Sequence, residues 1–390
     1  MRYKLLLITV LALAVRATPV DPVANVRDFG AAGDGKTDDT KAILKAIESL
    51  PPNGGVVYFP PGHYLTRTVP GKSYVTFQGN SSWGYRNATS GSTVISPVSD
   101  DLTTLFDLKG SVGTRLVGLT LDGMNKGKAM HGVYAKHGGV EQNIVIDDCR
   151  IMSFTGSGIR LDNSWVFAIR HSILFENMMA GIDGTGSYDG WILDNQISVN
   201  GRADGHGGLY AARFATVTIT ANRIEANYGG GIVLGPGGFD TIQVSNCTFD
   251  RNFGPGISMV ASKPGQSNGS GNSITGNLFR RNGHRNPRVW VPTPEQDPGP
   301  DLECQLRLEN VSGTVVTGNS MISWPHGKDA ERNIPHSPKR GMILRALTDS
   351  VVADNSLFEG ASDELIFDKG GHTNTVIRDN PGSLWKPKPK

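Results

Sequence analysis

Residues 192–197 read Ile-Leu-Asp-Asn-Gln-Ile, and residues 219–224 read Ile-Thr-Ala-Asn-Arg-Ile. Both follow one pattern: an aliphatic residue, two residues, a small polar residue, one residue and an apolar residue. The small polar member of this pattern recurs along the chain as Cys149, Ser172, Asn195, Asn222, Cys247, Asn277, Asn319 and Asn355. Spacings of 23 to 42 residues between short runs that alternate apolar and polar residues predict a β-solenoid, not helical repeats.

A second motif, Gly-apolar-x-apolar, follows the first in several repeats, for example at residues 158–161 and 231–234. Short strands stacked coil upon coil predict an all-β, single-stranded parallel β-helix that rises about 4.8 Å per coil. A side-chain amide both donates and accepts, so stacked Asn residues can bond along the axis. Cys149 and Cys247 would then lie four coils or roughly 19 Å apart, too far for a disulfide. We predict that they are buried, small apolar residues.

Composition supports a folded, exported protein. The 390 residues include 50 Gly and 22 Pro without a Gly-x-y period, and the hydrophobic fraction of 38% excludes a disordered chain. A net charge of +2 and no basic stripe argue against nucleic-acid binding. Arg2, Lys4 and the apolar run 5–15 predict a signal peptide over residues 1–17, with an uncleaved anchor as the alternative. We expect a secreted or periplasmic protein with no membrane segment after cleavage.

Residues 25–50 predict a strand, a Gly/Asp-rich turn and an amphipathic helix that begins near Asp38 or Asp39. We expect residues 18–60 to form an N-terminal cap, because the open end of a solenoid needs a cover. The β-helix would then occupy residues 61–385, followed by a basic tail at 386–390.

The cap region also carries a family resemblance. Residues 26–31 (Val-Arg-Asp-Phe-Gly-Ala), 34–40 (Asp-Gly-Lys-Thr-Asp-Asp-Thr) and 54–62 (Gly-Gly-Val-Val-Tyr-Phe-Pro-Pro-Gly) resemble the pectate lyase superfamily. More narrowly, they resemble its rhamnogalacturonase/epimerase-like branch of right-handed parallel β-helix proteins. The resemblance implies this fold, export and action on a polysaccharide. It leaves the reaction open, because the superfamily includes lyases, hydrolases, C5-epimerases and phage tailspikes.

The candidate site lies where ionisable and aromatic residues occupy the outward-facing positions of the glycine motif on successive coils. The first four coils present Tyr134, Lys136, Arg160, Asp162, Asp183 and Tyr210. The next two present the unreactive Val233 and Ser258, and a later coil presents Arg307. Longer connections at 123–130, 201–207, 282–303 and 324–340 would wall a groove suited to a chain-like substrate.

We predict β-elimination on an acidic, uronate-containing polysaccharide. This reaction needs a group that neutralises the carboxylate, a base for the C5 proton and an acid for the leaving oxygen. The residues that we assign to catalysis are Tyr210, His206, Arg160, Asp183 and Asp162. The residues that we assign to substrate binding are Lys136, Tyr134, Arg213, Arg307 and Trp290.

Other hypotheses stay open. Asp162 and Asp183, with Cα atoms about 8 Å apart, could serve an inverting glycoside hydrolase. Residues 205–207 are similar to the Gly-His-Gly of polygalacturonases, but the paired Asp-Asp of that family is missing. The Asp-Pro-His-Asp-Arg signature of alginate epimerases is also absent, so the choice among lyase, hydrolase and C5-epimerase remains open.

A non-catalytic polysaccharide-binding β-helix is the third class of hypothesis. No cofactor is predicted with certainty. Ca²⁺ is the alternative, through the oxygens of Asp183, Asp189 and Asp204.

Overall fold

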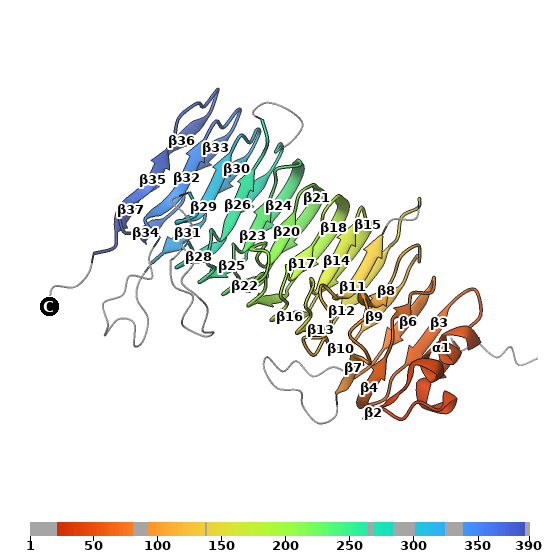
Figure 1. The fold of residues 1–390 in the computed structure, drawn as a ribbon. Coiled ribbons are helices and arrows are strands. Elements are labelled where there is room, and N and C mark those ends of the chain that lie inside the picture. Colours follow the sequence, from red (N-terminus) through yellow and green to blue (C-terminus); the bar gives the residue numbers. More distant parts are fainter. Residues whose placement is uncertain are drawn as a thin grey trace, which may run out of the picture.

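The computed structural model describes residues 22–80, 92–136, 139–263, 269–283, 301–323 and 338–386. Within these ranges the chain winds into three long parallel sheets of 13, 11 and 11 strands, here sheets A, B and C, plus a two-stranded sheet near the C-terminal end (Figure 1). Successive strands go to A, then B, then C, and each pairs with its counterpart one coil later. The predicted all-β parallel β-helix is confirmed.

The strands of sheet A are β1 (Val23–Asn25), β3 (Gly55–Tyr58), β6 (Val75–Gln78), β9 (Arg115–Val117), β12 (Ile144–Asp147), β15 (Trp165–Arg170), β18 (Ser187–Leu193), β21 (Phe214–Thr220), β24 (Phe239–Ser245), β27 (Ser273–Thr275), β30 (Val315–Thr317), β33 (Val351–Ala353) and β36 (Val376–Arg378). The strands of sheet B are β2 (Asp34–Asp38), β4 (Gly62–Thr66), β7 (Thr93–Pro97), β10 (Thr120–Asp122), β13 (Arg150–Met152), β16 (Ile173–Phe175), β19 (Gln196–Ser198), β22 (Arg223–Glu225), β25 (Thr248–Asp250), β28 (Leu278–Arg280) and β31 (Ser320–Ile322).

The strands of sheet C are β5 (Val69–Pro70), β8 (Thr104–Asp107), β11 (His131–Lys136), β14 (Ile159–Asp162), β17 (Ile182–Asp183), β20 (Leu209–Ala211), β23 (Ile232–Leu234), β26 (Ile257–Val260), β29 (Cys304–Glu309), β32 (Arg340–Arg345) and β35 (Glu364–Asp368). The two-stranded sheet pairs β34 (Leu357–Ala361) with β37 (Gly382–Leu384).

One helix, α1 (Thr40–Ser49), lies at the N-terminal end of the solenoid, next to the 3-10 helix η1 (Val26–Phe29) (Figure 1). Its apolar face, which includes Ile43 and Ile47, is buried in the core. The Asp38 carboxylate accepts the Thr40 N–H, as expected of a helix-start residue. Asp39, the other residue near which we expected the helix to begin, makes no side-chain hydrogen bond to the helix, because its carboxylate accepts the backbone N–H groups of Ala32 and Gly33 instead.

The predicted ladder of small polar residues is present at the turn between sheets A and B. Asn195 donates its side-chain amide to Asn222 Oδ1 at 3.0 Å, and Asn277 does the same to Asn319 one coil later. Cys149 and Cys247 occupy rungs of this ladder as buried free thiols. Burial raises the pKa of Cys149 to about 12 and that of Cys247 to about 11, so neither is a thiolate at neutral pH.

A second Asn ladder, which we did not predict, runs along the turn between sheets B and C. Its rungs are Asn177, Asn200, Asn227, Asn252 and Asn282, and it ends on Gln305. The rungs are buried, and from Asn200 onward each side-chain oxygen accepts both an amide and a backbone N–H from the preceding rung, as Asn200 Oδ1 does from Asn177. The ladder provides hydrogen-bond partners for buried backbone groups at the turn from which the longer connections leave the solenoid.

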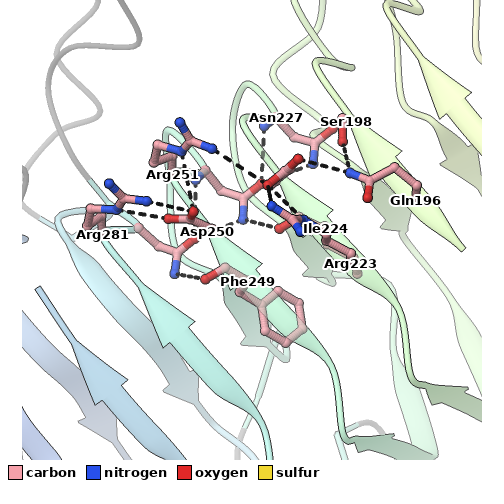
Figure 2. A network of polar contacts seen from close by, with 12 residues as sticks. Gln196, Ser198, Arg223, Ile224, Asn227, Phe249, Asp250, Arg251 and Arg281 are labelled. Carbon is pink, nitrogen blue, oxygen red and sulfur yellow. Dashed lines mark hydrogen bonds and ion pairs between the residues drawn. The ribbon is translucent and has the colours of Figure 1, made fainter. Parts of the chain in front are cut away.

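A buried ionic network braces the outer face of sheet B beside this ladder (Figure 2). Asp250 accepts two hydrogen bonds from Arg281, at 3.0 and 2.7 Å. Glu225 accepts from Gln196 at 3.1 Å and from Arg223 at 3.0 Å. Each buried carboxylate thus has cationic or amide donors, and Arg251, 3.7 Å from Glu225 and 3.4 Å from Asp250, links the two. The network therefore connects β19, β22 and β25 with Arg281, which directly follows β28.

Candidate active site

The outward-facing positions of sheet C align in one row, which we call the charged row. Strand pairing places Tyr134 beside Arg160, Arg160 beside Asp183, and Asp183 beside Tyr210. Residues that alternate with them point into the core and are buried, as Ile159, Ile182 and Leu209 are. Neighbouring members of the row are thus one interstrand distance apart, about 4.8 Å. The expected alignment of these four residues on consecutive coils is confirmed.

The first part of the row is a small cluster around Asp162. The Tyr134 hydroxyl donates to Asp162 Oδ2 at 3.3 Å, and Lys136 Nζ lies 3.6 Å from the same oxygen. Burial, followed by the negative charge of Asp162, raises the pKa of Tyr134. Lys136 keeps nearly half of its side chain exposed and faces solvent above this cluster.

The middle of the row is an ion pair between neighbouring coils. Arg160 Nη1 lies 3.7 Å from Asp183 Oδ2, and Asp183 also accepts from the Thr185 hydroxyl at 2.8 Å. Asp183 is only 7% exposed, whereas the Arg160 side chain is 37% exposed. Asp183 therefore anchors the guanidinium, and the exposed part of Arg160 remains accessible to a carboxylate from solvent.

His131 joins this part of the site, although the sequence analysis did not select it. Its Nδ1 accepts the Ser157 N–H at 2.9 Å. Burial, and secondarily the charge of Arg160, lowers its pKa to about 4, so the ring is neutral at neutral pH and its proton is on Nε2. The residue stands directly before the glycine of its motif, at Gly132. The corresponding residues in the next two coils are Ser157 and Ala180, so an ionisable residue at this position was a signal that we could have used.

The densest part of the site joins the loop 201–207 to strand β20. The His206 and Tyr210 rings stack with centroids 3.7 Å apart and planes 4° apart. On the other side, His206 Nδ1 lies 2.9 Å from Asp204 Oδ2, and Asp204 Oδ1 accepts the His206 backbone N–H at 2.9 Å. Since Nδ1 faces the carboxylate, Nε2 is the nitrogen available to a substrate.

Tyr210 is held in its protonated form. Burial is the largest cause that raises its pKa, and the negative charges of Asp183 and Asp204 add to the effect. A phenol with a raised pKa keeps its proton at neutral and mildly alkaline pH. It is therefore a hydrogen-bond donor and proton donor, and not a base, under these conditions.

An apolar cleft with a volume of about 640 Å³ continues the charged row beyond Tyr210. Its floor is built by the next outward positions, Val233, Ser258 and Arg307, which pair in that order. Its walls include Tyr228 and Phe253. Gly229, which also lines the cleft, has a positive φ, and a Cβ there would overlap the carbonyl oxygen of Gly205, so the loop can pack against the next coil only on glycine.

The remaining predicted site residues lie in different places in the structure. Arg213 is exposed beyond the end of β20, and among the described residues it forms no hydrogen bond or ion pair with His206 or Tyr210. Trp290 lies outside the described residues. Asp162 and Asp183 contact different cations, Lys136 and Arg160, and not each other.

The metal hypothesis gains no support from the aspartates proposed for it. Asp189 accepts the Trp165 indole N–H at 2.8 Å. Across the part of the chain that the structure describes, no three His, Cys, Asp or Glu side chains form a group that could hold a metal ion. Ca²⁺ dependence stays a prediction. In the same described ranges, no helix has the length and apolar character needed to cross a membrane.

Comparison with known proteins identifies the family. Residues 23–231 match the model of the "Rhamnogalacturonase A/epimerase, pectate lyase-like" family. The chain belongs to this family. The match covers the N-terminal cap and the coils that carry the whole charged row from Tyr134 to Tyr210, and it makes the protein a member of a carbohydrate-active β-helix enzyme family. The resemblance that the sequence motifs suggested is confirmed.

Two curated proteins of Azotobacter vinelandii illustrate the sequence relationships. Mannuronan C5-epimerase AlgE5 is 30% identical over 244 residues, which cover 58% of this chain and 24% of the epimerase. Alginate lyase 7 is 61% identical over 41 residues, which cover 10% of this chain and 5% of the lyase. The matches thus span a quarter or less of these relatives.

Solved structures agree on the fold. A DFA-IIIase from Arthrobacter chlorophenolicus A6 without its lid superposes with a TM-score of 0.57 at 16% identity, covering 94% of this chain and 99% of that one. The Dettilon tailspike protein superposes with a TM-score of 0.52 at 16% identity, covering 91% and 68%. At such low identity the likeness concerns the architecture alone.

Proposed function

We propose that the protein is an exported enzyme that cleaves a uronate-containing polysaccharide by β-elimination at the charged row. The observation that carries the proposal is the stacked His206–Tyr210 pair beside Asp183 and Arg160. It puts an imidazole and a protonated phenol on one coil and a guanidinium two coils earlier. The sequence relatives named for mannuronan and alginate support a uronate substrate.

The roles follow from the geometry and from charge. The exposed side of Arg160 binds the uronate carboxylate and stabilises the negative charge that develops on it when the C5 proton leaves. His206 Nε2 takes the C5 proton, and Asp204 at Nδ1 stabilises the imidazolium that forms. The Tyr210 hydroxyl then protonates the C4 oxygen. The C5–H and C4–O bonds break, a C4–C5 double bond forms, and the proton of Tyr210 goes to the leaving sugar.

The stack also bears on the choice between elimination and epimerisation. No sugar ring fits between two rings 3.7 Å apart, so base and acid address the same face of the substrate. A syn elimination needs this arrangement, because the C5 proton and the C4 oxygen leave from one face. Epimerisation needs a proton donor on the opposite face. C5-epimerisation is nonetheless the second candidate, because the 30% identical relative is a mannuronan C5-epimerase.

One experiment separates these reactions. The protein is incubated in D₂O with mannuronan, alginate and other uronate polysaccharides, and the products are followed by near-ultraviolet absorbance, a reducing-end assay and NMR. Elimination yields an absorbing unsaturated end. Epimerisation yields inverted, deuterated C5 without absorbance, and hydrolysis by Asp162 and Asp183 yields reducing ends without absorbance. Retention on a polysaccharide without any turnover would favour the non-catalytic binding protein and contradict the proposal.

A further inference from the structure

The outer face of sheet A carries two uncharged rows of side chains from β18 to β33. Ile192, Ile219 and Val244 point into the core and are fully buried, so the residues on either side of each of them point outward. Strand pairing aligns these outward residues coil by coil. The second row runs from Leu193 to Ala353 through serine and threonine, and the first row consists of Trp191, Thr218, Gln243, Ser273, Val315 and Val351.

Trp191 gives this face an accessible aromatic surface. The residue is 46% exposed although it lies within strand β18. Thr218 lies beside it on β21, and the exposed Gln243 follows on β24, so a hydroxyl and an amide stand one and two interstrand steps away, about 4.8 and 9.6 Å. An indole flanked by such groups suits a sugar chain. The C–H face of a sugar ring stacks on an aromatic ring, while its hydroxyl groups bond to hydroxyl and amide side chains.

The strands around Trp191 carry an excess of negative charge. β21 has no charged residue, and the charged residues of β18 and β24 are Asp189 and Asp240. The preceding strand β15 adds Arg170, whose guanidinium donates two hydrogen bonds to Asp147, at 2.9 and 2.8 Å, so that this pair has no net charge. An acidic polysaccharide therefore meets net repulsion at these strands, whereas a neutral polysaccharide does not.

We propose that the outer face of sheet A is a second, non-catalytic site, which binds a neutral polysaccharide across its strands with Trp191 as the stacking residue. A chain that lies across the strands meets one outward side chain of the row per coil, first the indole and then Thr218 and Gln243. The charged row belongs to sheet C, so the two sites lie on different sheets of the solenoid. The protein can thus hold a neutral polysaccharide while it acts on an acidic one, and the inference does not depend on the reaction at the charged row.

Binding to neutral polymers tests this site. The full chain is mixed with suspensions of cellulose, mannan, xylan and chitin, and the protein left in solution gives the dissociation constant. We expect retention on at least one polymer, and high salt should not weaken it, because no ionic contact contributes. Trp191→Ala should weaken this binding about tenfold, the loss expected when one aromatic contact is removed. Trp191→Phe keeps an aromatic ring and should retain most of the affinity. Phe358→Ala removes a ring that is 53% exposed on β34, and as the matched control it should bind like the native protein.

Turnover and molecular mass are the independent readouts. Trp191→Ala should turn over soluble uronate oligosaccharides at the native rate, since the charged row is on another sheet. Retention on none of the neutral polymers, retention that high salt abolishes, or native affinity in Trp191→Ala would overturn the inference. A native dimer that Trp191→Ala converts to a monomer would also overturn it, because the face would then belong to a second copy of the chain. Retention on a neutral polymer without turnover of any uronate polymer would keep this site and defeat the proposed function, and turnover without retention would do the opposite.

Discussion

The His206 ring lies flat on the Tyr210 ring, with centroids 3.7 Å apart, and thereby joins a loop to the sheet that carries the charged row. Asp204 holds the other edge of the imidazole at Nδ1, so the ring is clamped between a carboxylate and a phenol. Because the two rings are in stacking contact, both lie on the same side of a substrate bound at the row. Four predictions test this arrangement and the scaffold beneath it.

Tyr210→Phe should reduce kcat/KM for elimination by about 10²- to 10⁴-fold, the usual contribution of a general acid. The ring that stacks on His206 remains, so the circular dichroism spectrum and the melting temperature should not change. Formation of unsaturated ends measures the rate. Tyr188→Phe, on the outer face of sheet A, is the matched control and should retain native activity. Native activity in Tyr210→Phe would remove the hydroxyl from the mechanism.

Activity should persist into the alkaline range and fall only above the ordinary tyrosine pKa of about 10, because burial raises the pKa of Tyr210. The nearby negative charge of Asp183 contributes to the shift. Asp183→Asn removes this charge and should therefore lower the pKa of Tyr210. The alkaline limb of the kcat/KM profile should then move to lower pH, even if the maximum value of kcat/KM also changes. A limb that stays in place would show that another group titrates there.

The pKa of about 4 at His131 predicts an acid-sensitive fold. In the unfolded chain the ring has its ordinary pKa of about 6.5. Between these values the unfolded state binds a proton that the folded state excludes, so stability is complete above pH 6.5 and falls as the pH drops toward 4. His131→Gln should flatten this part of the melting-temperature profile. NMR titration provides the direct check, because the His131 ring should remain neutral down to about pH 5.

Asn227→Asp keeps the acceptor of the second ladder but removes the donor to Asn252 and to the Ile197 carbonyl. Leaving a buried group unsatisfied costs about 1–3 kcal/mol. We expect a lower melting temperature and faster hydrogen exchange around loop 201–207. Asn125→Asp, an exposed position with positive φ, serves as the control. Unchanged exchange in Asn227→Asp would mean that the ladder does not support the site.

The second ladder could have been predicted. Its rungs follow the first ladder by five residues at 172/177, 195/200, 222/227, 247/252 and 277/282, a spacing visible in the printed sequence. For His131 the sequence offers an ionisable residue directly before the motif glycine, but its burial, which lowers its pKa to about 4, is visible only in the structure. Val233 and Ser258 looked unreactive in the sequence, and they form the floor of the cleft.

Local periodicity was sufficient to assign this chain to a β-helix and to align Tyr134, Arg160, Asp183 and Tyr210 in one row. The reason is that strand pairing in a solenoid repeats one register, so spacing in the sequence translates directly into position across the sheet. Loops obey no such repeat. The stacking of His206 on Tyr210, the anchoring of Arg160 by Asp183 and the shape of the apolar cleft depend on side chains from different coils packing in three dimensions, and packing cannot be inferred from spacing along one chain.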